Sequence, residues 1–512
     1  MKKFSLLYEP WIHVLRNGRI EEIGLEEVLL DAHNIVRIDT PSPLEEAALH
    51  RLLLAVLHRA LEGPKRLEDA LELWRKGRFP DDPIRAYLSR YRERFFLFHP
   101  EAPFFQVADL PEKPAPMPWT KLVPELASGN NSTLSDYNTD KDPSRASYAQ
   151  AARALLVHQA FAVSGTINRL EVTSGTAGPL ASAAVFLPTG DTLFQTLLFN
   201  LVPYSTQDFA SDAPIWEQEP LMTHNLTGGR KEMLFSGRTR VYTWLSRAVR
   251  FLDTGDGVQY MAYGPGVKPE ATQFRDPMLA YTGGIKAPAP WRLLAERSFW
   301  RDLDSMLHPK THSMPATLEH ANELLSYLAD DKEEDYLALR VIGQVLDQRK
   351  RGKVLDIRRD VYPIPRGALT ALMQLKLNEA VRKANDLGSK LSDLAQSLAR
   401  DVLGPNRRDA ASSLARSLPL ERLYWFSLDA SFPEFLQKLG ENGATEFWLE
   451  CICSAARHAW ASTRISLGTQ ARHLASIERA ERRFQDLMRK ICKERKHGQG
   501  NGLRQAPSET QV

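Results

Sequence analysis

The chain has little cysteine, no long apolar run and almost no net charge, and each scarcity excludes a class of protein. Three cysteines are too few for a disulfide scaffold and favour a reducing compartment, so we expect a cytoplasmic protein. Cys451 and Cys453 lie in a helical pattern, where we interpret both as packing residues. No run of about 18 apolar residues occurs and the N-terminus lacks a signal-peptide core, which predicts no transmembrane span. With a net charge of only +3, any nucleic-acid binding must depend on local basic patches.

Common catalytic motifs are also absent. The sequence has no G-x-x-x-x-G-K-[ST] loop, no G-x-S-x-G elbow and no H-E-x-x-H helix. The acidic run at residues 330–335 could supply a metal-dependent nuclease, but contiguous carboxylates are more typical of a solvated loop. His308, His312 and His320 could offer imidazoles, yet a structural zinc site needs four ligands and no cysteine lies nearby. We therefore expect no metal, no cofactor and no enzymatic activity.

The first 363 residues mix helical and strand patterns. Asn17-Gly18 between short apolar runs predicts a β-hairpin. Ser42, followed by Pro43 and by Glu45 as the partner in a capping box, predicts a helix that reaches residue 61. Residues 239–245 have the pattern of a short strand. These signals predict a large mixed α+β domain over residues 1–363.

From about residue 364 the chain changes character. Prolines become rare and apolar residues recur at helical spacing, which predicts an all-α four-helix bundle over residues 364–496. We expect helix breaks near Pro419 and Pro433. The tail at residues 497–512 is rich in Gly, Gln and Ser and is predicted to be disordered.

Two irregular polar stretches, residues 128–140 and 163–179, bracket an apolar helical pattern at residues 148–161. Glycine and asparagine allow the backbone to approach a ligand closely. Small residues with many backbone N–H groups suit a polyanion better than an apolar ligand. A flexible surface excursion fits the same residues equally well.

Basic residues gather in two further places. Residues 347–360 hold six basic against three acidic side chains, in a loop between helices or before a strand. Residues 472–496 hold nine basic against four acidic, on a helix with an apolar stripe. Either could contact phosphates, and either could be a solvated surface. Lys268 ends a Gly/Pro turn and could project one charge into a groove, although most such lysines only solvate a turn.

Seven short motifs occur in a characteristic order. They lie at residues 98–106, 128–131, 158–162, 177–180, 192–203, 276–278 and 423–425. In this order and spacing, and with an α+β domain ahead of a bundle, the chain resembles the CasA family, the large subunit of the type I-E CRISPR surveillance complex Cascade. The resemblance covers nearly the whole chain.

The resemblance implies contacts with DNA. Lys268 looks like the lysine that reaches into the minor groove of the protospacer-adjacent motif (PAM), and Gln348 like the glutamine wedge that splits the first base pair beside it. Asp347 lies beside that wedge. The residues that look like the family's glycine loop at the PAM duplex, or that could hold the DNA backbone, are Ala162, Val163, Ser164, Gly165, Arg349, Lys350 and Arg351.

The resemblance also implies contacts with RNA and protein. The stretch at residues 128–140 looks like the family loop that touches the 5′ handle of the guide RNA and seats the subunit. Its candidate residues are Asn130, Asn131, Thr133, Leu134, Ser135 and Tyr137. Many relatives have an aromatic residue where this chain has Ser135.

A non-catalytic recognition subunit is therefore expected. Its partners would be the backbone, small and 5′-handle subunits, the guide RNA, double-stranded target DNA and a recruited helicase-nuclease, with no membrane. Recognition of the PAM would be followed by opening of the duplex into an R-loop. A metal-dependent nuclease and a protein-interaction scaffold are the alternatives.

Overall fold

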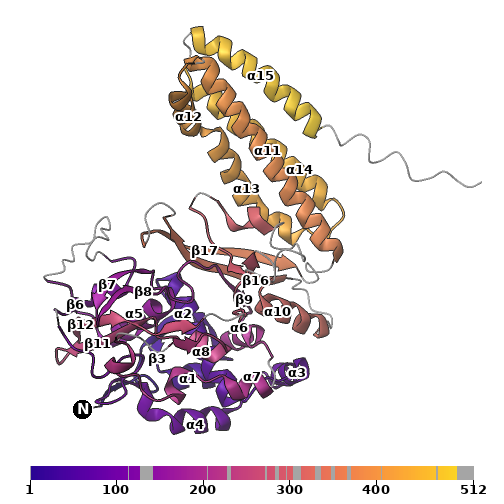
Figure 1. Ribbon diagram of the computed structural model, residues 1–512. Helices are drawn as coiled ribbons and strands as arrows, with labels where there is room; N and C mark the ends of the chain where they lie inside the picture. The colour runs from indigo at the N-terminus through magenta and orange to yellow at the C-terminus, as the bar shows by residue number, and fades with distance from the viewer. Residues whose placement is uncertain are drawn as a thin grey trace, which may run out of the picture. The chain divides into compact units, whose positions relative to one another are not determined.

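The computed structural model describes residues 2–113, 115–126, 142–203, 206–227, 232–270, 274–282, 288–295, 297–303, 313–328, 336–347, 352–365, 371–404, 406–468 and 471–492. They form two compact units. The first comprises Met1–Phe299 and Ser305–Tyr362, and the second comprises Trp300–Asp304 and Pro363–Val512. The first unit mixes helices with strands and the second is helical (Figure 1), so the predicted α+β class with a helical C-terminal region is confirmed.

The strands of the first unit form several small sheets. Three sheets have three strands, in the orders β3-β2-β4, β11-β12-β6 and β17-β16-β9, and the pairs β1-β5, β7-β8, β10-β13 and β14-β15 stand apart. The strands are β1 (Lys3–Ser5), β2 (Ile12–Arg16), β3 (Arg19–Ile23), β4 (Ile35–Ile38), β5 (Phe96–Phe98), β6 (Met117–Pro118), β7 (Gly165–Arg169), β8 (Val172–Gly175), β9 (Val185–Thr189), β10 (Glu232–Leu234), β11 (Arg247–Asp253), β12 (Val258–Pro265), β13 (Lys268–Glu270), β14 (Tyr281–Thr282), β15 (Ala289–Pro290), β16 (Tyr336–Leu346) and β17 (Val354–Pro365).

Helices α2 and α5 form the centre of the first unit's core, since most of their residues are buried. The α-helices of this unit are α1 (Leu25–Leu30), α2 (Pro43–Ala60), α3 (Leu67–Lys76), α4 (Asp81–Arg90), α5 (Tyr148–Phe161), α6 (Leu193–Asn200), α7 (Thr206–Ser211), α8 (Arg238–Tyr242) and α10 (Ala316–Tyr327). Short 3-10 helices lie at η1 (Arg92–Phe95), η2 (Trp119–Leu122), η3 (Ile215–Glu217), η4 (Thr223–Asn225) and η5 (Phe299–Asp302). The described residues include no helix long and apolar enough to cross a membrane.

Local turn and cap signals place the N-terminal elements as predicted. Asn17 and Gly18 have φ of 52° and 72° between β2 and β3, the left-handed pair that a type I′ hairpin needs. The Ser42 hydroxyl accepts a hydrogen bond from the backbone N–H of Leu44, so α2 begins at the expected cap. The predicted capping box is wrong. Glu45 turns instead toward the guanidinium of Arg153 on α5, with Oε2 and Nε 3.6 Å apart.

The predicted strand at residues 239–245 is also wrong. Its first half is helix α8, because the Asp212 carboxylate accepts hydrogen bonds from the backbone N–H groups of Thr239 and Arg240 at 2.7 and 2.9 Å. A carboxylate at a helix N-terminus satisfies donors that the helix itself leaves unpaired. This cap comes from a residue 27 positions away along the chain.

The second unit contains five helices among its described residues. They are α11 (Ala371–Leu403), α12 (Arg408–Ser417), α13 (Pro419–Gln437), α14 (Ala444–Ser466) and α15 (Ala471–Cys492), and the four long ones run side by side (Figure 1). The chain breaks before Pro419 as expected, which splits off the short α12. Pro433, in contrast, lies inside α13, so the break predicted there is wrong.

A disulfide and a tryptophan from a distant segment help to hold the second unit together. Cys453 on α14 and Cys492 on α15 form a disulfide, so the interpretation of Cys453 as a simple packing residue is wrong. The segment Trp300–Asp304 contributes Trp300, whose ring stacks on Phe432 at 4.4 Å and whose indole N–H donates to Asp429 at 2.7 Å. Trp300 is 1% exposed, so it belongs to the core of this unit.

Candidate nucleic-acid interface

The predicted glycine loop at residues 162–165 connects α5 to β7. Its start is fixed: the Ala162 N–H donates to His158 O at 2.9 Å, and Ala162 O accepts from the Gly178 N–H at 2.7 Å. Ala162 is buried, whereas Ser164 and Gly165 are exposed. The second polar stretch is partly regular, because β7 and β8 pair as a hairpin. The loop therefore presents two small exposed residues on a fixed base.

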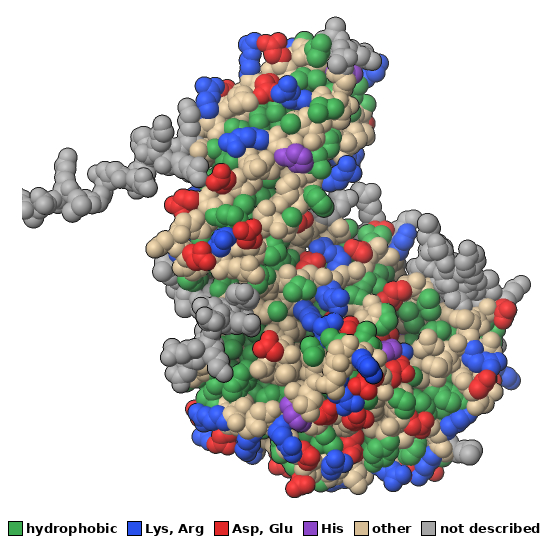
Figure 2. Space-filling view, turned by 180° about the vertical axis from the view of Figure 1, so that it is seen from behind, with side chains coloured by type: hydrophobic (Ala, Val, Ile, Leu, Met, Phe, Trp, Pro, Cys, Tyr) green, Lys and Arg blue, Asp and Glu red, His purple; other side chains and the backbone are tan. Residues whose placement is uncertain are grey.

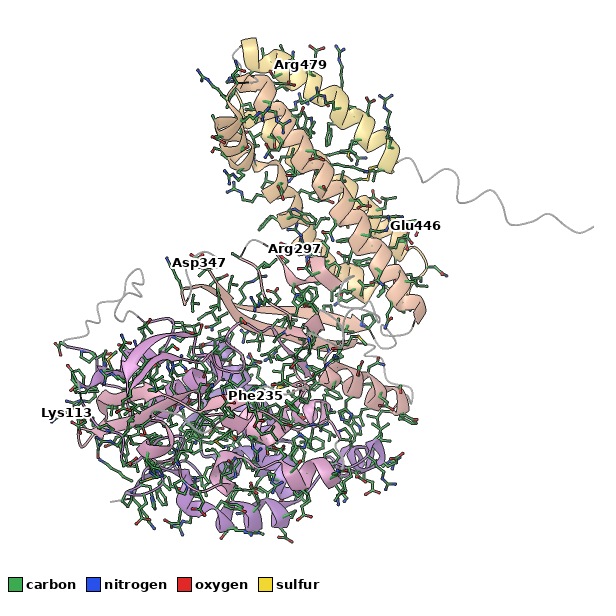
Figure 3. All side chains as sticks on the ribbon, viewed as in Figure 1. Lys113, Phe235, Arg297, Asp347, Glu446 and Arg479 are labelled. Carbon is green, nitrogen blue, oxygen red and sulfur yellow. A yellow bond between two sulfur atoms is a disulfide. The ribbon has the colours of Figure 1, made fainter. Side chains whose placement is uncertain are left out.

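The predicted wedge turn lies beside this loop. Asp347 follows β16, and its backbone N–H donates to Lys353 O at 2.9 Å, which closes a turn between two strands (Figure 3 labels Asp347). Gly352 in this turn has φ +81°, and a Cβ built on it would lie 3.3 Å from Ser164 O. The turn and the loop, nearly two hundred positions apart, are thus in close contact. Gln348, Arg349, Lys350 and Arg351 lie outside the described residues.

A hollow of about 310 Å³ adjoins both segments. Its lining includes Lys121, Ser164, Thr166, Tyr263 and Gly352. It also reaches Val123, Pro124 and Leu126, shortly before the predicted RNA-handle loop that begins at residue 128. That loop, with Asn130, Asn131, Thr133, Leu134, Ser135 and Tyr137, lies outside the described residues.

Lys268 opens β13, which runs parallel to β10 with Lys268 opposite Glu232. The Lys268 ammonium forms an ion pair with the Glu232 carboxylate, and both side chains are about half exposed (48% and 45%). The residue before Lys268 is fixed by a backbone hydrogen bond, because the Val267 N–H donates to Leu245 O at 2.9 Å. Gly266 allows this approach, since a Cβ there would collide with Leu245 O.

A buried arginine joins these segments, and no local sequence signal indicated it. Arg247 is 2% exposed at the start of β11. Its guanidinium donates to Val163 O at 2.5 Å and to Thr176 O at 2.5 Å. The Thr176 hydroxyl in turn lies 3.5 Å from Val267 O. The loop and the residue before Lys268 are thus linked through Arg247 and the Thr176 hydroxyl.

His158 and Tyr263 line the same hollow and contact Arg247 or each other. Tyr263 Oη lies 3.0 Å from His158 Nε2 and accepts a hydrogen bond from Arg247 Nε at 3.1 Å. Burial and the nearby charge of Arg247 lower the pKa of His158 to about 3, so its ring is neutral near pH 7. The neutral ring can accept a hydrogen bond from the Tyr263 hydroxyl, while the hydroxyl oxygen accepts one from Arg247.

The residues weighed for metal chemistry gather no site in the described part of the chain. His320 is buried in the core with Nε2 3.2 Å from Leu198 O, and burial lowers its pKa to about 4. His308, His312 and the acidic run at 330–335 lie outside the described residues. Among the residues that are described, no group of three His, Cys, Asp or Glu side chains could hold a metal ion.

The basic helix α15 is largely paired with carboxylates. Arg479 and Arg483 lie 3.5 and 3.6 Å from Asp401, and Arg482 pairs with Glu478 at 2.6 Å (Figure 3 labels Arg479). On the face drawn in Figure 2, basic and acidic side chains are interspersed. Exposed pairs of this kind contribute little and are typical of a solvated helix face.

Comparison with known proteins assigns the fold and the family. The family model described as CRISPR-associated protein Cse1 matches residues 5–463. A protein of Thermus thermophilus described as CRISPR-associated protein CasA/Cse1 is 53% identical over 503 residues, which is 96% of this chain and 99% of that protein.

Solved structures agree. The structure of Thermus thermophilus CasA (Cse1) superposes with a TM-score of 0.88 at 51% identity, covering 96% of this chain and all of the other. A chain from a structure called CRISPR RNA-guided surveillance complex shares the fold with a TM-score of 0.76 at 23% identity, over 95% of this chain and 100% of its own length.

Proposed function

The chain belongs to the Cse1 family of CRISPR-associated proteins, and on that premise we propose that it is the non-catalytic large subunit of a guide-RNA-directed surveillance complex in antiviral defence. Shared fold with a chain of a CRISPR RNA-guided surveillance complex supports the assignment. Within that complex the chain recognises the PAM of double-stranded DNA.

The contact between Gly352 and Ser164 is the observation that carries the proposal. It brings together a loop with two exposed small residues and the turn that holds the predicted wedge. Lys268 is connected to the same loop through Arg247 and Thr176. A close backbone and a single lysine suit the minor groove, whose degenerate pattern of donors and acceptors permits relaxed reading of the PAM.

Duplex opening is proposed for the turn that follows Asp347. Gln348 would insert beside the PAM and separate the first base pair, and Arg349, Lys350 and Arg351 would hold the backbone. Unstacking costs about a few kcal/mol per step. Pairing of the opened strand with the guide RNA offsets that cost. Gln348→Ala should slow R-loop formation in stopped-flow measurements while leaving affinity for the PAM duplex nearly unchanged.

Further partners follow from the same premise. The loop at residues 128–140 would contact the 5′ handle of the guide RNA and seat the subunit beside the 5′-handle subunit. The helical unit would contact the small subunit and the displaced strand, and the loaded complex would recruit the helicase-nuclease. Guide RNA and invading DNA meet in the cytoplasm, which is the expected location.

The experiment compares assembled complexes that contain wild type, Lys268→Ala or Lys76→Ala, a control that removes an exposed lysine at the end of α3. We expect Lys268→Ala to weaken binding of the PAM duplex without affecting assembly, and Lys76→Ala to behave as wild type. Equal affinity of wild type for matched and altered PAMs would refute PAM recognition. Robust metal-dependent cleavage by the purified chain would support the nuclease instead.

A further inference from the structure

The side chain of Arg247 forms hydrogen bonds with several segments of the candidate interface that are distant from it in the sequence. Its backbone is gripped by Gln159 of α5, whose side chain accepts from the Arg247 N–H and donates to Arg247 O, both at 2.9 Å. The side chain of Arg247 therefore extends from a backbone position that Gln159 fixes in the core. Because it is 2% exposed, water cannot replace the bonds that it makes.

Each nitrogen of the guanidinium has a partner. One terminal nitrogen donates to Val163 O at 2.5 Å, and the other donates to Thr176 O at 2.5 Å and to Ser246 O at 2.7 Å. Nε donates to the Tyr263 hydroxyl at 3.1 Å. The rigid fork of arginine can join two carbonyls from different segments, which a single lysine ammonium cannot do with the same geometry.

The two carbonyls belong to the segments that must act together on DNA. Val163 lies in the loop at 162–165, directly before exposed Ser164. Thr176 follows β8 and its hydroxyl contacts Val267 O at 3.5 Å, one residue before Lys268. The spacing between the loop and the lysine therefore depends on where the guanidinium sits.

A neighbouring glycine leaves room for this guanidinium. A Cβ on Gly175 would lie 2.9 Å from Arg247 Cζ and 3.1 Å from its terminal nitrogen, and 2.5 Å from the Ile167 side chain. Gly175 thus permits the position of Arg247, and it also pairs directly with Gly165 of the loop in the β7–β8 hairpin.

We infer that Arg247 is a positioning residue for PAM recognition, which sets the distance between the loop at residues 162–165 and Lys268 and contacts no nucleic acid itself. The inference rests on the proposed function. Its charge adds to the effect: among the described residues its hydrogen bonds go only to neutral oxygens, so no carboxylate cancels it there. A buried positive charge beneath the loop favours a phosphate above it.

The test uses Arg247→Lys and Gly175→Ala in the assembled complex. Arg247→Lys keeps the charge but loses the two-carbonyl contact, and Gly175→Ala keeps the arginine but crowds its guanidinium and the Ile167 side chain. For each, affinity is measured for a duplex with the matched PAM and for the same duplex with the PAM altered. We expect each variant to lower the ratio of the two affinities by about tenfold, because the loop and Lys268 no longer keep their spacing. Arg250→Lys on the same strand, whose guanidinium bonds Leu110 O and Glu112, is the control and should keep the ratio.

Melting temperature and assembly are recorded in parallel. If Arg247 were merely structural, the variants would melt earlier or assemble less, while the complexes that form would keep the wild-type ratio. That result would overturn the inference. If Arg247→Lys fails to fold, the affinity ratios of Gly175→Ala and Tyr263→Phe still test the inference, since each variant disturbs the guanidinium without replacing it. A wild-type complex that shows no PAM preference would refute the proposed function, which is a different outcome.

Discussion

Lys268 forms an ion pair with Glu232, its direct neighbour in the parallel register of β10 and β13. The lysine proposed to enter the minor groove is therefore held by a carboxylate in the protein without DNA. Exposed ion pairs are weak, so DNA can displace Glu232, but the carboxylate remains close and repels phosphates. Glu232 should thus limit affinity for the PAM duplex.

Glu232→Gln is expected to tighten binding of the PAM duplex by about twofold to fivefold, because it releases Lys268 and removes a negative charge. The measurement is a binding titration with assembled complex at two salt concentrations, and the gain should shrink at high salt. Glu270→Gln is the matched control, since it removes the same charge from β13 without touching this ion pair. An equal gain from both variants would show that Glu232 acts only through overall charge.

Gly352→Ala tests the contact between the wedge turn and the loop. Alanine at φ +81° costs about 1–2 kcal/mol, and its Cβ would also press on Ser164 O at 3.3 Å. We expect slower R-loop formation in stopped-flow measurements. Gly255→Ala is the control, because its φ is +103° but nothing lies within 4 Å of the added Cβ. If both variants slow opening equally, backbone strain alone is responsible and the contact is not needed.

Glu45 makes the stability of the first unit depend on pH. Burial raises the pKa of this carboxyl from 4.5 to about 7, despite the nearby Arg153. The folded protein therefore keeps a proton that the unfolded chain has lost, and this contribution to stability disappears as pH rises from 4.5 through 7. Glu45→Gln should be more stable than wild type at pH 8, by about 1–3 kcal/mol, and equal to it near pH 4. Chemical denaturation at both pH values measures the difference, and a pH-independent effect would contradict the assignment.

The disulfide should stabilise the second unit. Cys453 and Cys492 are 39 residues apart, and closing a loop of that size contributes up to about 4 kcal/mol in the chain-entropy account. Reductant should therefore lower the melting temperature of wild type. Cys492→Ser should melt early with or without reductant, and Cys451→Ser, which changes the free cysteine, should keep the response. Three reactive thiols in the denatured, unreduced protein would show that the bond does not form.

Short-range signals predicted the elements that short-range contacts build. The hairpin at Asn17-Gly18 and the start of α2 at Ser42 depend on residues within a few positions, and both predictions are confirmed. Where a side chain distant in the sequence helps to form an element, the local pattern predicted the wrong structure. Asp212 caps α8 from 27 residues away, and Arg153 draws Glu45 from its predicted cap.

The candidate site likewise has parts that local sequence patterns predicted and a part that they missed. Exposed loops rich in Ser, Gly and Asn could be recognised locally, and the family resemblance assigned them roles. Arg247 could not be found, because its partners at Val163 and Thr176 lie 84 and 71 positions away. Nothing around it in the sequence distinguishes it from Arg250, three residues later on the same strand.

Trp300 has a consequence for anyone who wishes to study the protein in pieces. Its segment separates the two sequence segments of the first unit, yet its ring is part of the helical core with Phe432 and Trp448. A fragment that begins at residue 363 would lack Trp300 and would have a cavity in its helical core. A fragment that ends at residue 362 would keep Trp300 but lose the helices that bury it. The polypeptide passes between the two units three times. Dissection by truncation would therefore damage both halves, and a permuted or co-expressed design that keeps residues 300–304 with the helices is the safer starting point.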